Sequence, residues 1–169
     1  SGTGSEQVIT HGGNSDLQAD WVWIKRRDAT NNHRLTDVVR GATKEIYSDL
    51  ADAEDTQAQG LKSFASDGFT LGTNAGYNAS SATYVSWNWK AGSSTGVGSI
   101  DSAGSVNTDA GFSIIKYTGT GSAGTIAHGL AQKPTFIIVK EISGNGVDNW
   151  KLQHSSTGAG ALPGSLNLT

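Results

Sequence analysis

The stretch Asp20-Trp21-Val22-Trp23-Ile24-Lys25 decides the fold class. It is rich in aromatic and β-branched residues, which favour β-strands. A second run, Phe136-Ile137-Ile138-Val139-Lys140, has the same character and also ends in lysine. Because both faces of each run carry bulky apolar side chains, we expect two central strands, covered on two sides or lying at a subunit contact.

The surroundings of the two runs also repeat. Residues 1–13 and 118–130 agree at seven positions, and Ser1-Gly-Thr-Gly-Ser5 returns as Thr118-Gly-Thr-Gly-Ser122. The stretch 32–35 matches 149–152 at an offset of 117, whereas the two apolar runs are offset by 115. Repetition at a fixed period predicts a tandem array of one module.

The two copies differ in what they contain. An apolar run at 111–117 precedes the second copy, whereas nothing precedes Ser1 in the first. We therefore expect a first module over 1–90 that lacks its first strand and a partial second module over 109–169, cut from a longer polypeptide. The run at 111–117 is expected to complete a sheet, in its own copy, with the first copy or with a neighbouring chain.

Other segments are assigned by composition. Residues 91–108 predict a flexible linker, since nine of the 18 are Gly or Ser. The segment 49–62 is compatible with either a short helix or an irregular loop. Further strands are expected at 69–72, 83–90, 111–117 and 135–142, with 34–39 and 44–47 as additional candidates.

The composition limits both fold class and function. The chain has 23 Gly, two Pro and no Cys among 169 residues, which favours an all-β protein of antiparallel sandwich or jelly-roll modules without disulfides. A net charge of -3 with both signs scattered argues against nucleic-acid binding. No apolar stretch reaches the roughly 18 to 20 residues of a membrane span, and no signal peptide is visible.

Aromatic residues are the main candidates for ligand contact. Alternation along 83–90 places Val85, Trp87 and Trp89 on one face, which we expect to be core. Trp150 and Tyr77 lie in loop-like surroundings and are the predicted exposed residues. The candidate ligand-binding residues are Trp150, Tyr77, Asn149 and Lys151, although the two aromatics could equally lie at an interface.

The sequence contains no clear pattern of catalytic residues, and we therefore predict that the chain is not an enzyme. A glycosidase needs two suitably placed carboxylates, yet Glu45 and Glu141 are more compatible with solvated strand edges. His11 and His128 each precede a glycine and are expected to be turn residues whose rings cap local backbone groups.

Two loops have a composition that is compatible with calcium binding. The oxygen-rich loops at 28–32 and 145–149 could contribute Asp28 and Asp148 as ligands. Turn formation by Asn and Asp explains both loops without a metal, so we predict no required cofactor.

Several longer motifs occur together. They are Asp20–Lys25, Asn32–Lys44, Asp67–Gly72, Tyr84–Gly92, Ala110–Gly119 and His128-Gly-Leu followed by Pro134. Together they resemble the tandem β-rich modules of tail-fibre and virion-appendage proteins of marine tailed bacteriophages, which are similar to concanavalin A-type jelly rolls. The first copy departs from that pattern at His11-Gly12-Gly13, where Leu is replaced and no Pro follows.

The resemblance implies a function in the extracellular virion. We expect a non-enzymatic structural and adhesive segment that associates with copies of itself, as a trimer or filament, and contacts host-surface glycans. A carbohydrate-binding module of a secreted enzyme and a self-assembling extracellular filament are the alternatives.

Overall fold

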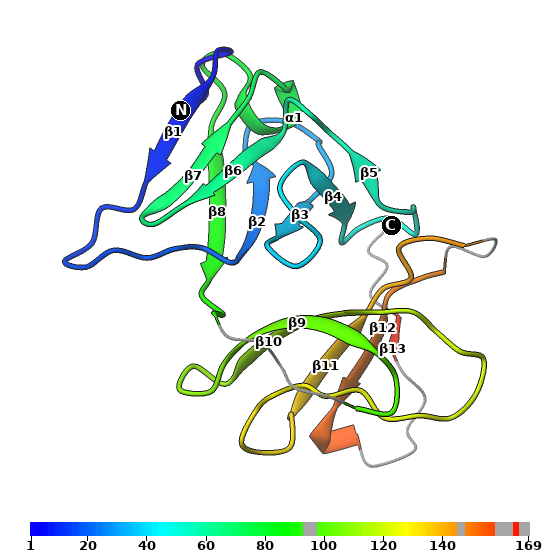
Figure 1. Cartoon of the computed structure of the whole chain (residues 1–169). Coiled ribbons are helices and arrows are strands. Elements are labelled where there is room, and N and C mark those ends of the chain that lie inside the picture. The colour runs from blue at the N-terminus through cyan, green and yellow to red at the C-terminus, as the bar shows by residue number, and fades with distance from the viewer. Residues whose placement is uncertain (93–97, 145–147, 158–163, 166–169) are drawn as a thin grey trace.

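Two antiparallel sheets pack face to face in the first half of the chain. The structure is a computed structural model that describes residues 1–92, 98–144, 148–157 and 164–165. It shows a first lobe containing β1 to β8 and a second containing β9 to β13 (Figure 1). Three predicted segments lie partly outside the described residues. They are the expected linker (93–97), the second calcium loop (145–147) and the second module (158–163 and 166–169).

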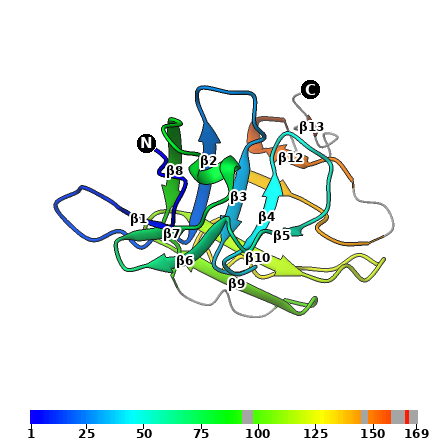
Figure 2. The ribbon, with the colours of Figure 1, turned by 90° about the horizontal axis from the view of Figure 1, so that it is seen from above.

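The larger sheet of the first lobe has five strands in the order β5-β4-β3-β2-β8. Figure 2 shows these strands side by side in that order. The strands are β2 (Trp21–Arg26), β3 (Arg34–Asp37), β4 (Lys44–Tyr47), β5 (Asp55–Thr56) and β8 (Tyr84–Trp89). The central position predicted for the 20–25 run is confirmed, because β2 lies between β3 and β8.

The smaller sheet covers the inner face of the larger one. Its order is β1-β7-β6, with β1 at Gln7–Thr10, β6 at Leu61–Ala65 and β7 at Gly68–Leu71. A one-turn helix, α1 (Ala75–Asn78), follows, and its N-cap Asn74 accepts a hydrogen bond from the Gly76 amide at 2.8 Å.

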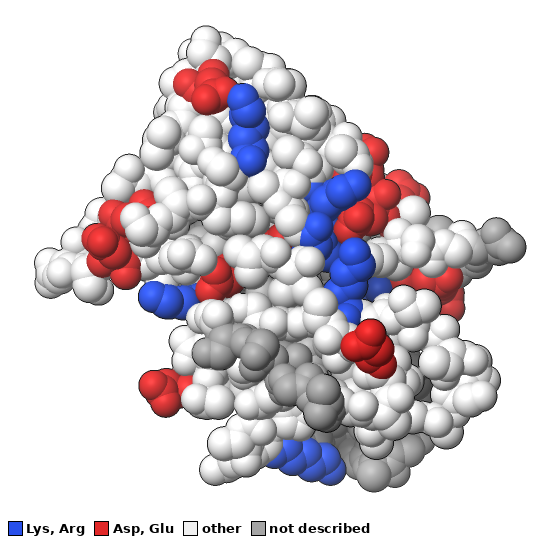
Figure 3. Space-filling model, in the orientation of Figure 1, with Lys and Arg blue, Asp and Glu red and all other residues white. Residues whose placement is uncertain are grey.

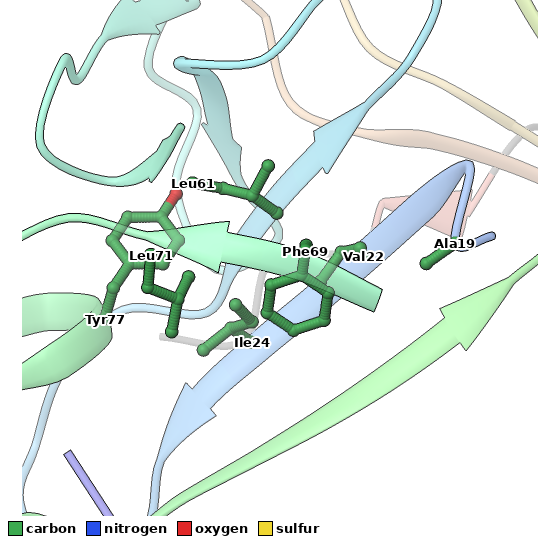
Figure 4. Close-up of a cluster of buried hydrophobic side chains, with 7 residues drawn as sticks. All are labelled: Ala19, Val22, Ile24, Leu61, Phe69, Leu71 and Tyr77. Atoms are coloured by element: carbon green, nitrogen blue, oxygen red, sulfur yellow. The ribbon is translucent and has the colours of Figure 1, made fainter. Parts of the chain in front are cut away.

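The core of the first lobe lies between these two sheets (Figure 4). From the larger sheet, Val22 and Ile24 point into it and are 1% and 3% exposed. They meet apolar side chains of β6, β7 and α1, namely Leu61, Phe69, Leu71 and Tyr77. Complete burial of each large side chain contributes roughly 1.5–3 kcal/mol, so this layer holds the sandwich together.

The second lobe contains two further antiparallel sheets. A hairpin pairs β9 (Ser102–Asn107) with β10 (Phe112–Tyr117). A three-stranded sheet has the order β11-β12-β13, with β11 at Phe136–Val139, β12 at Lys151–His154 and β13 at Gly164–Ser165; a 3-10 helix at Ser155–Thr157 follows β12.

The β11-β12 pair repeats the register of β2 and β3. Trp23 lies opposite Leu35, and Ile138 lies opposite Leu152. The third strands agree as well, since β12 pairs with β13 on its other side as β3 pairs with β4. The two sequence offsets of 115 and 117 therefore describe one strand arrangement used twice.

The repeated Gly-Thr-Gly-Ser motif also folds alike in both copies. Thr3 Oγ1 donates to the Ser5 carbonyl at 2.7 Å and accepts from the Ser5 amide at 3.2 Å. Thr120 and Ser122 form the same two bonds at 3.3 and 3.4 Å. The glycine between each pair has φ of 73° and 71°, the left-handed region that glycine adopts without strain.

The helix considered for 49–62 is wrong. This segment instead contains β5 and a turn, and it ends in the first residues of β6. Long-range backbone bonds hold it open: Gln57 N donates to Thr43 O at 2.7 Å, and Glu54 N donates to Ile142 O of the second lobe at 2.9 Å. Tertiary hydrogen bonding therefore overrides the modest helix propensity of its Ala and Gln residues.

The segment expected to be a linker contains a strand. Within 91–108, β9 pairs over its whole length with β10, so a flexible linker is wrong for residues 102–107. Because β10 uses this partner, the run at 111–117 belongs to a two-stranded sheet of its own. The sequence of β9 is rich in Gly and Ser and therefore does not look like a strand. Its pairing with β10 depends mainly on backbone hydrogen bonds, which the side chains do not reveal.

The two lobes touch through side chains of the second. Lys140, at the end of β11, donates from Nζ to the Ala51 carbonyl at 2.9 Å and to the Asp148 and Glu141 carbonyls. Its counterpart Lys25 also donates to the carbonyl of the next residue, at the same 2.7 Å as Lys140 does. Burial lowers the pKa of Lys140 from its usual value, as expected for an ammonium among carbonyls at a lobe contact.

Candidate functional site

The outer face of the five-stranded sheet carries a cluster of tryptophans. In register, Trp21 lies opposite Trp89, and Trp23 lies opposite Trp87. The ring centroids of these pairs are 4.7 and 5.6 Å apart. We call these four residues the aromatic face.

Two members of the aromatic face are open to solvent. Trp87 is 44% exposed and Trp89 is 37% exposed. The expectation that they lie in the core is therefore wrong, although the alternation that places Val85, Trp87 and Trp89 on one side agrees with the register. The core-facing side of the neighbouring strand instead carries Val22 and Ile24, so the bulkier aromatics face outward.

A pocket of about 320 Å³ adjoins the aromatic face at Trp23. This volume is at the lower end of the range of small-ligand sites. It is lined by Trp23, Lys25, Thr30, Asn31, Asn32, His33, Ser48 and Asp49. One aromatic wall and several amide, hydroxyl and charged groups from the β2-β3 and β4-β5 connections therefore converge here.

The pocket wall selects one tautomer of the neutral His33 ring. Trp23 Nε1, which can only donate, bonds to His33 Nδ1 at 2.9 Å. His33 Nδ1 is therefore an acceptor, and in the neutral ring the proton is on Nε2. The pKa of His33 lies below its usual value, chiefly because of burial; Lys25 lowers it further and Asp49 opposes the shift.

The β4-β5 connection positions the acidic side of the pocket. Asp49 Oδ1 accepts a hydrogen bond from the His33 amide at 3.0 Å. Lys25 Nζ is directed to the carbonyls of Arg26 and Ala29. The pocket groups are thus preorganised by bonds within the first lobe, which reduces the entropic cost of binding.

The second lobe covers two other parts of the same face. Phe112 stacks on Trp21 and Trp89, with ring centroids 5.7 and 6.2 Å apart. Trp150 packs on Leu35 and Ile46. Trp87 remains substantially exposed beside the Trp23 pocket.

The predicted exposure of Tyr77 and Trp150 is wrong. Tyr77 is 2% exposed, in the first-lobe core, and Trp150 is 6% exposed, with its Nε1 donating to the Tyr47 carbonyl at 2.8 Å. Short polar loops surround both residues in sequence, but long-range packing determines their burial. Tyr77 lies in a different part of the molecule from the 149–151 stretch, so the predicted set does not form one site.

The other two predicted residues lie at the start of β12. Lys151 forms an ion pair with Asp148 at 3.2 Å, and its side chain is 44% exposed. Asn149 is half-buried beside Trp150, and its amide bonds to the Asp148 carboxylate at 3.0 Å. These residues contribute to the lobe contact through their neighbour Trp150.

Glu45 is buried, so its expected place at a solvated strand edge is wrong. It is 1% exposed and accepts hydrogen bonds at 2.5 Å from the hydroxyls of Tyr47 and Tyr77. Arg34 adds an ion pair at 3.3 Å. Burial and the Glu45 carboxylate raise the pKa of both tyrosines, so their hydroxyls stay protonated and donate hydrogen bonds. Glu141 is exposed, as predicted.

The calcium candidates have protein partners. Asp28 pairs with Arg26 at 2.7 Å and accepts from the Thr83 amide, while Asp148 pairs with Lys151. These contacts lower the pKa of both carboxyls, most strongly through the basic side chains. In the described part of the chain, no three His, Cys, Asp or Glu side chains form a metal-binding group.

The two repeated histidines act as predicted. His11 Nδ1 bonds to the Leu17 carbonyl at 2.9 Å, and His128 Nδ1 accepts from the Leu130 amide at 3.0 Å. Each ring caps a nearby backbone group, which is a structural role.

Three pocket residues, Thr30, Asn31 and Asn32, lie in the 28–32 loop that the sequence offered for calcium, but the pocket itself was not predicted. A further signal is that the β2-β3 loop, 27–33, contains two asparagines and His33 and follows the aromatic strand that carries Trp23. Chemically, indole faces beside amide, carboxylate and ammonium groups suit a ligand with both apolar and hydroxylated surfaces.

Comparison with known proteins identifies a family for the chain. No curated protein and no solved structure matches the chain. None of the described helices is long and apolar enough to span a membrane. A family described as "Domain of unknown function (DUF7483)" matches residues 1–169, and the chain therefore belongs to this family.

Proposed function

We propose that this chain is a non-enzymatic adhesive segment of a bacteriophage tail fibre or virion appendage that binds host-surface glycans through the aromatic face. The observation that carries this proposal is the exposure of Trp87, whose ring centroid lies 5.6 Å from that of Trp23 in the pocket wall. Exposed aromatic clusters with a polar rim are typical of binding sites. The motifs shared with phage appendage modules support the virion setting.

Tandem modules suit weak surface contacts. A single contact of about 4 kcal/mol corresponds to a millimolar dissociation constant, and linking several copies raises the combined affinity by about 10² to 10⁴. A shallow face with one small pocket is enough under these conditions.

A glycan array with the purified chain, multimerised on a scaffold, tests the binding site. We expect Trp87→Ala to weaken binding to any retained glycan by about thirtyfold, since loss of a central aromatic contact costs about 2 kcal/mol. The matched control is Tyr117→Ala, which removes an aromatic of similar exposure, 39%, from β10. Equal binding by wild type and Trp87→Ala would exclude the aromatic face as the site.

Immunogold labelling of virions with an antibody to this chain tests the virion setting. Label on tail fibres or appendages is expected, and label absent from virions would contradict it. A carbohydrate-binding module of a secreted enzyme is the second candidate, because the 320 Å³ pocket could hold one sugar unit. Micromolar binding by a single unlinked chain, together with unlabelled virions, would favour that alternative.

A further inference from the structure

Strand β11 is an apolar edge strand. It has β12 on one side and no described strand on the other. All four of its residues are exposed: Phe136 by 49%, Ile137 by 42%, Ile138 by 36% and Val139 by 37%. The expectation that this run is covered like its counterpart is therefore wrong within this chain, and an uncovered apolar edge is a template for strand pairing.

The first lobe shows which strand lies at the equivalent edge. The counterparts of Ile137 and Val139 are Val22 and Ile24, which are only 1% and 3% exposed. On the edge that corresponds to the free edge of β11, β2 pairs with β8 over six residues. The two strands therefore differ in their neighbours: β2 has β8 on this edge and the β6-β7 layer against its inner face, whereas β11 has no described strand on its free edge.

The β2-β8 pairing specifies the chemistry of the missing neighbour. Trp87 lies opposite Trp23, and Asn88 lies opposite Val22. Transferred to β11, bulky aromatic residues would face Phe136 and Ile138, and small polar residues would face Ile137 and Val139. Such a neighbour combines backbone hydrogen bonding with side-chain specificity, as in other cases of strand addition.

We propose that the free edge of β11 accepts an antiparallel strand of the β8 type, supplied by a further copy of this module in which that strand is not paired with its own β2, in the register that β8 forms with β2. The residue equivalent to Trp87 lies opposite Ile138, and the residue equivalent to Asn88 lies opposite Ile137. This contact joins modules end to end and is independent of glycan binding.

Disulfide trapping tests both the contact and its register, since the chain contains no cysteine. The probe is a synthetic peptide of residues 82–91 that carries either Trp87→Cys or Asn88→Cys. The acceptor is the full chain with either Ile138→Cys or Ile137→Cys, two exposed positions where substitution leaves the core intact. Opposed Cβ atoms in paired strands are close enough for a disulfide.

Matched pairs should form the disulfide several-fold faster than mismatched pairs. The matched combinations are peptide Trp87→Cys with chain Ile138→Cys and peptide Asn88→Cys with chain Ile137→Cys. A control peptide that also carries Ser86→Pro should lose this preference, because proline cannot donate to the sheet. The unmodified peptide should also slow amide hydrogen exchange across 136–139 of the wild-type chain.

Three results would overturn the proposal. Equal rates for matched and mismatched pairs would exclude the register, and an unchanged exchange rate at 136–139 would exclude strand addition. Rapid formation of a chain-chain disulfide through Ile138→Cys, without peptide, would show that a second β11 occupies the edge. Circular dichroism of each chain variant identifies any that has lost its fold, and the exchange measurement needs no substitution.

Discussion

At the edge of the 320 Å³ pocket, the indole N–H of Trp23 bonds to His33, and this bond requires an unprotonated Nδ1. Trp23 thus links the aromatic face to the pocket. A sequence shows which residues alternate, but it does not show which side of the sheet is covered. For this reason Trp87 and Trp89 were assigned to the core, while the buried Tyr77 and Trp150 were assigned to the surface.

The pKa of His33 predicts a pH dependence of stability. Because its folded-state pKa is below the usual 6.5, the unfolded chain binds the proton first as the pH falls. The folded state therefore keeps the full contribution of His33 above pH 6.5 and loses it progressively below that value.

Urea unfolding at pH 7.5 and pH 5.5 measures this effect. We expect His33→Gln, which does not titrate, to lose less stability over this interval than the wild type. An NMR titration should show the wild-type ring protonating below pH 6.5, and Trp23→Phe should raise that midpoint. A wild-type midpoint at or above 6.5 would contradict the assignment.

The buried Glu45 predicts a stability effect of the Tyr77 hydroxyl. In Tyr77→Phe the carboxylate loses a 2.5 Å donor while it remains 1% exposed. We expect a loss of about 2 kcal/mol in the free energy of unfolding, measured by denaturant titration. Tyr117→Phe, at an exposed position, should change stability little; equal effects of the two substitutions would show that the bond to Glu45 contributes nothing.

At the scale of elements, the β1-β7 pairing depends on a close backbone approach. Gly68, the first residue of β7, has φ of +131°, and a Cβ there would lie 1.9 Å from the Ile9 carbonyl oxygen. We expect Gly68→Ala to cost about 3 kcal/mol in stability by forcing β1 from its partner. The control is Gly12→Ala, where a Cβ would meet nothing within 4 Å; similar thermal unfolding of the two variants would contradict this role.

The strands that are rich in apolar and aromatic residues could be predicted from sequence. The runs at 20–25, 69–72, 83–90, 111–117 and 135–142 all contain strands, as do 34–39 and 44–47. The strands β1, β5, β6, β9, β12 and β13 were not predicted, because they are short, polar or rich in Gly and Ser, and several of them pair with strands that are distant in the sequence. The pocket was missed because its groups come from two connections that only the β2-β3-β4 pairing brings together.

At the scale of the whole molecule, the repeat explains both the similarity and the difference between the lobes. The shared register of β2-β3 and β11-β12 supports the inferred tandem array. The second lobe lacks described counterparts of β6, β7 and β8, so β11 is open to solvent. On the face shown in Figure 3, basic and acidic groups lie among a largely uncharged surface, so charge is not the main feature of that face.

Trp150 is predicted to hold the lobes together. Its side chain packs on Leu35 and Ile46, and loss of a buried Trp costs about 3–5 kcal/mol. In Trp150→Ala we expect the lobes to separate, seen as a larger radius of gyration in small-angle X-ray scattering with an unchanged far-UV circular dichroism spectrum. An unchanged radius would show that Lys140 and Phe112 suffice for docking.

The most direct test of the account follows the five tryptophan indole N–H resonances by NMR while a glycan retained on the array is added. Because the aromatic face is the proposed site, the resonances of Trp87 and Trp23 should shift in a saturable manner. Trp150, which is 6% exposed and bonded to Tyr47, should not shift. Saturable shifts that leave Trp87 and Trp23 unmoved would contradict the account.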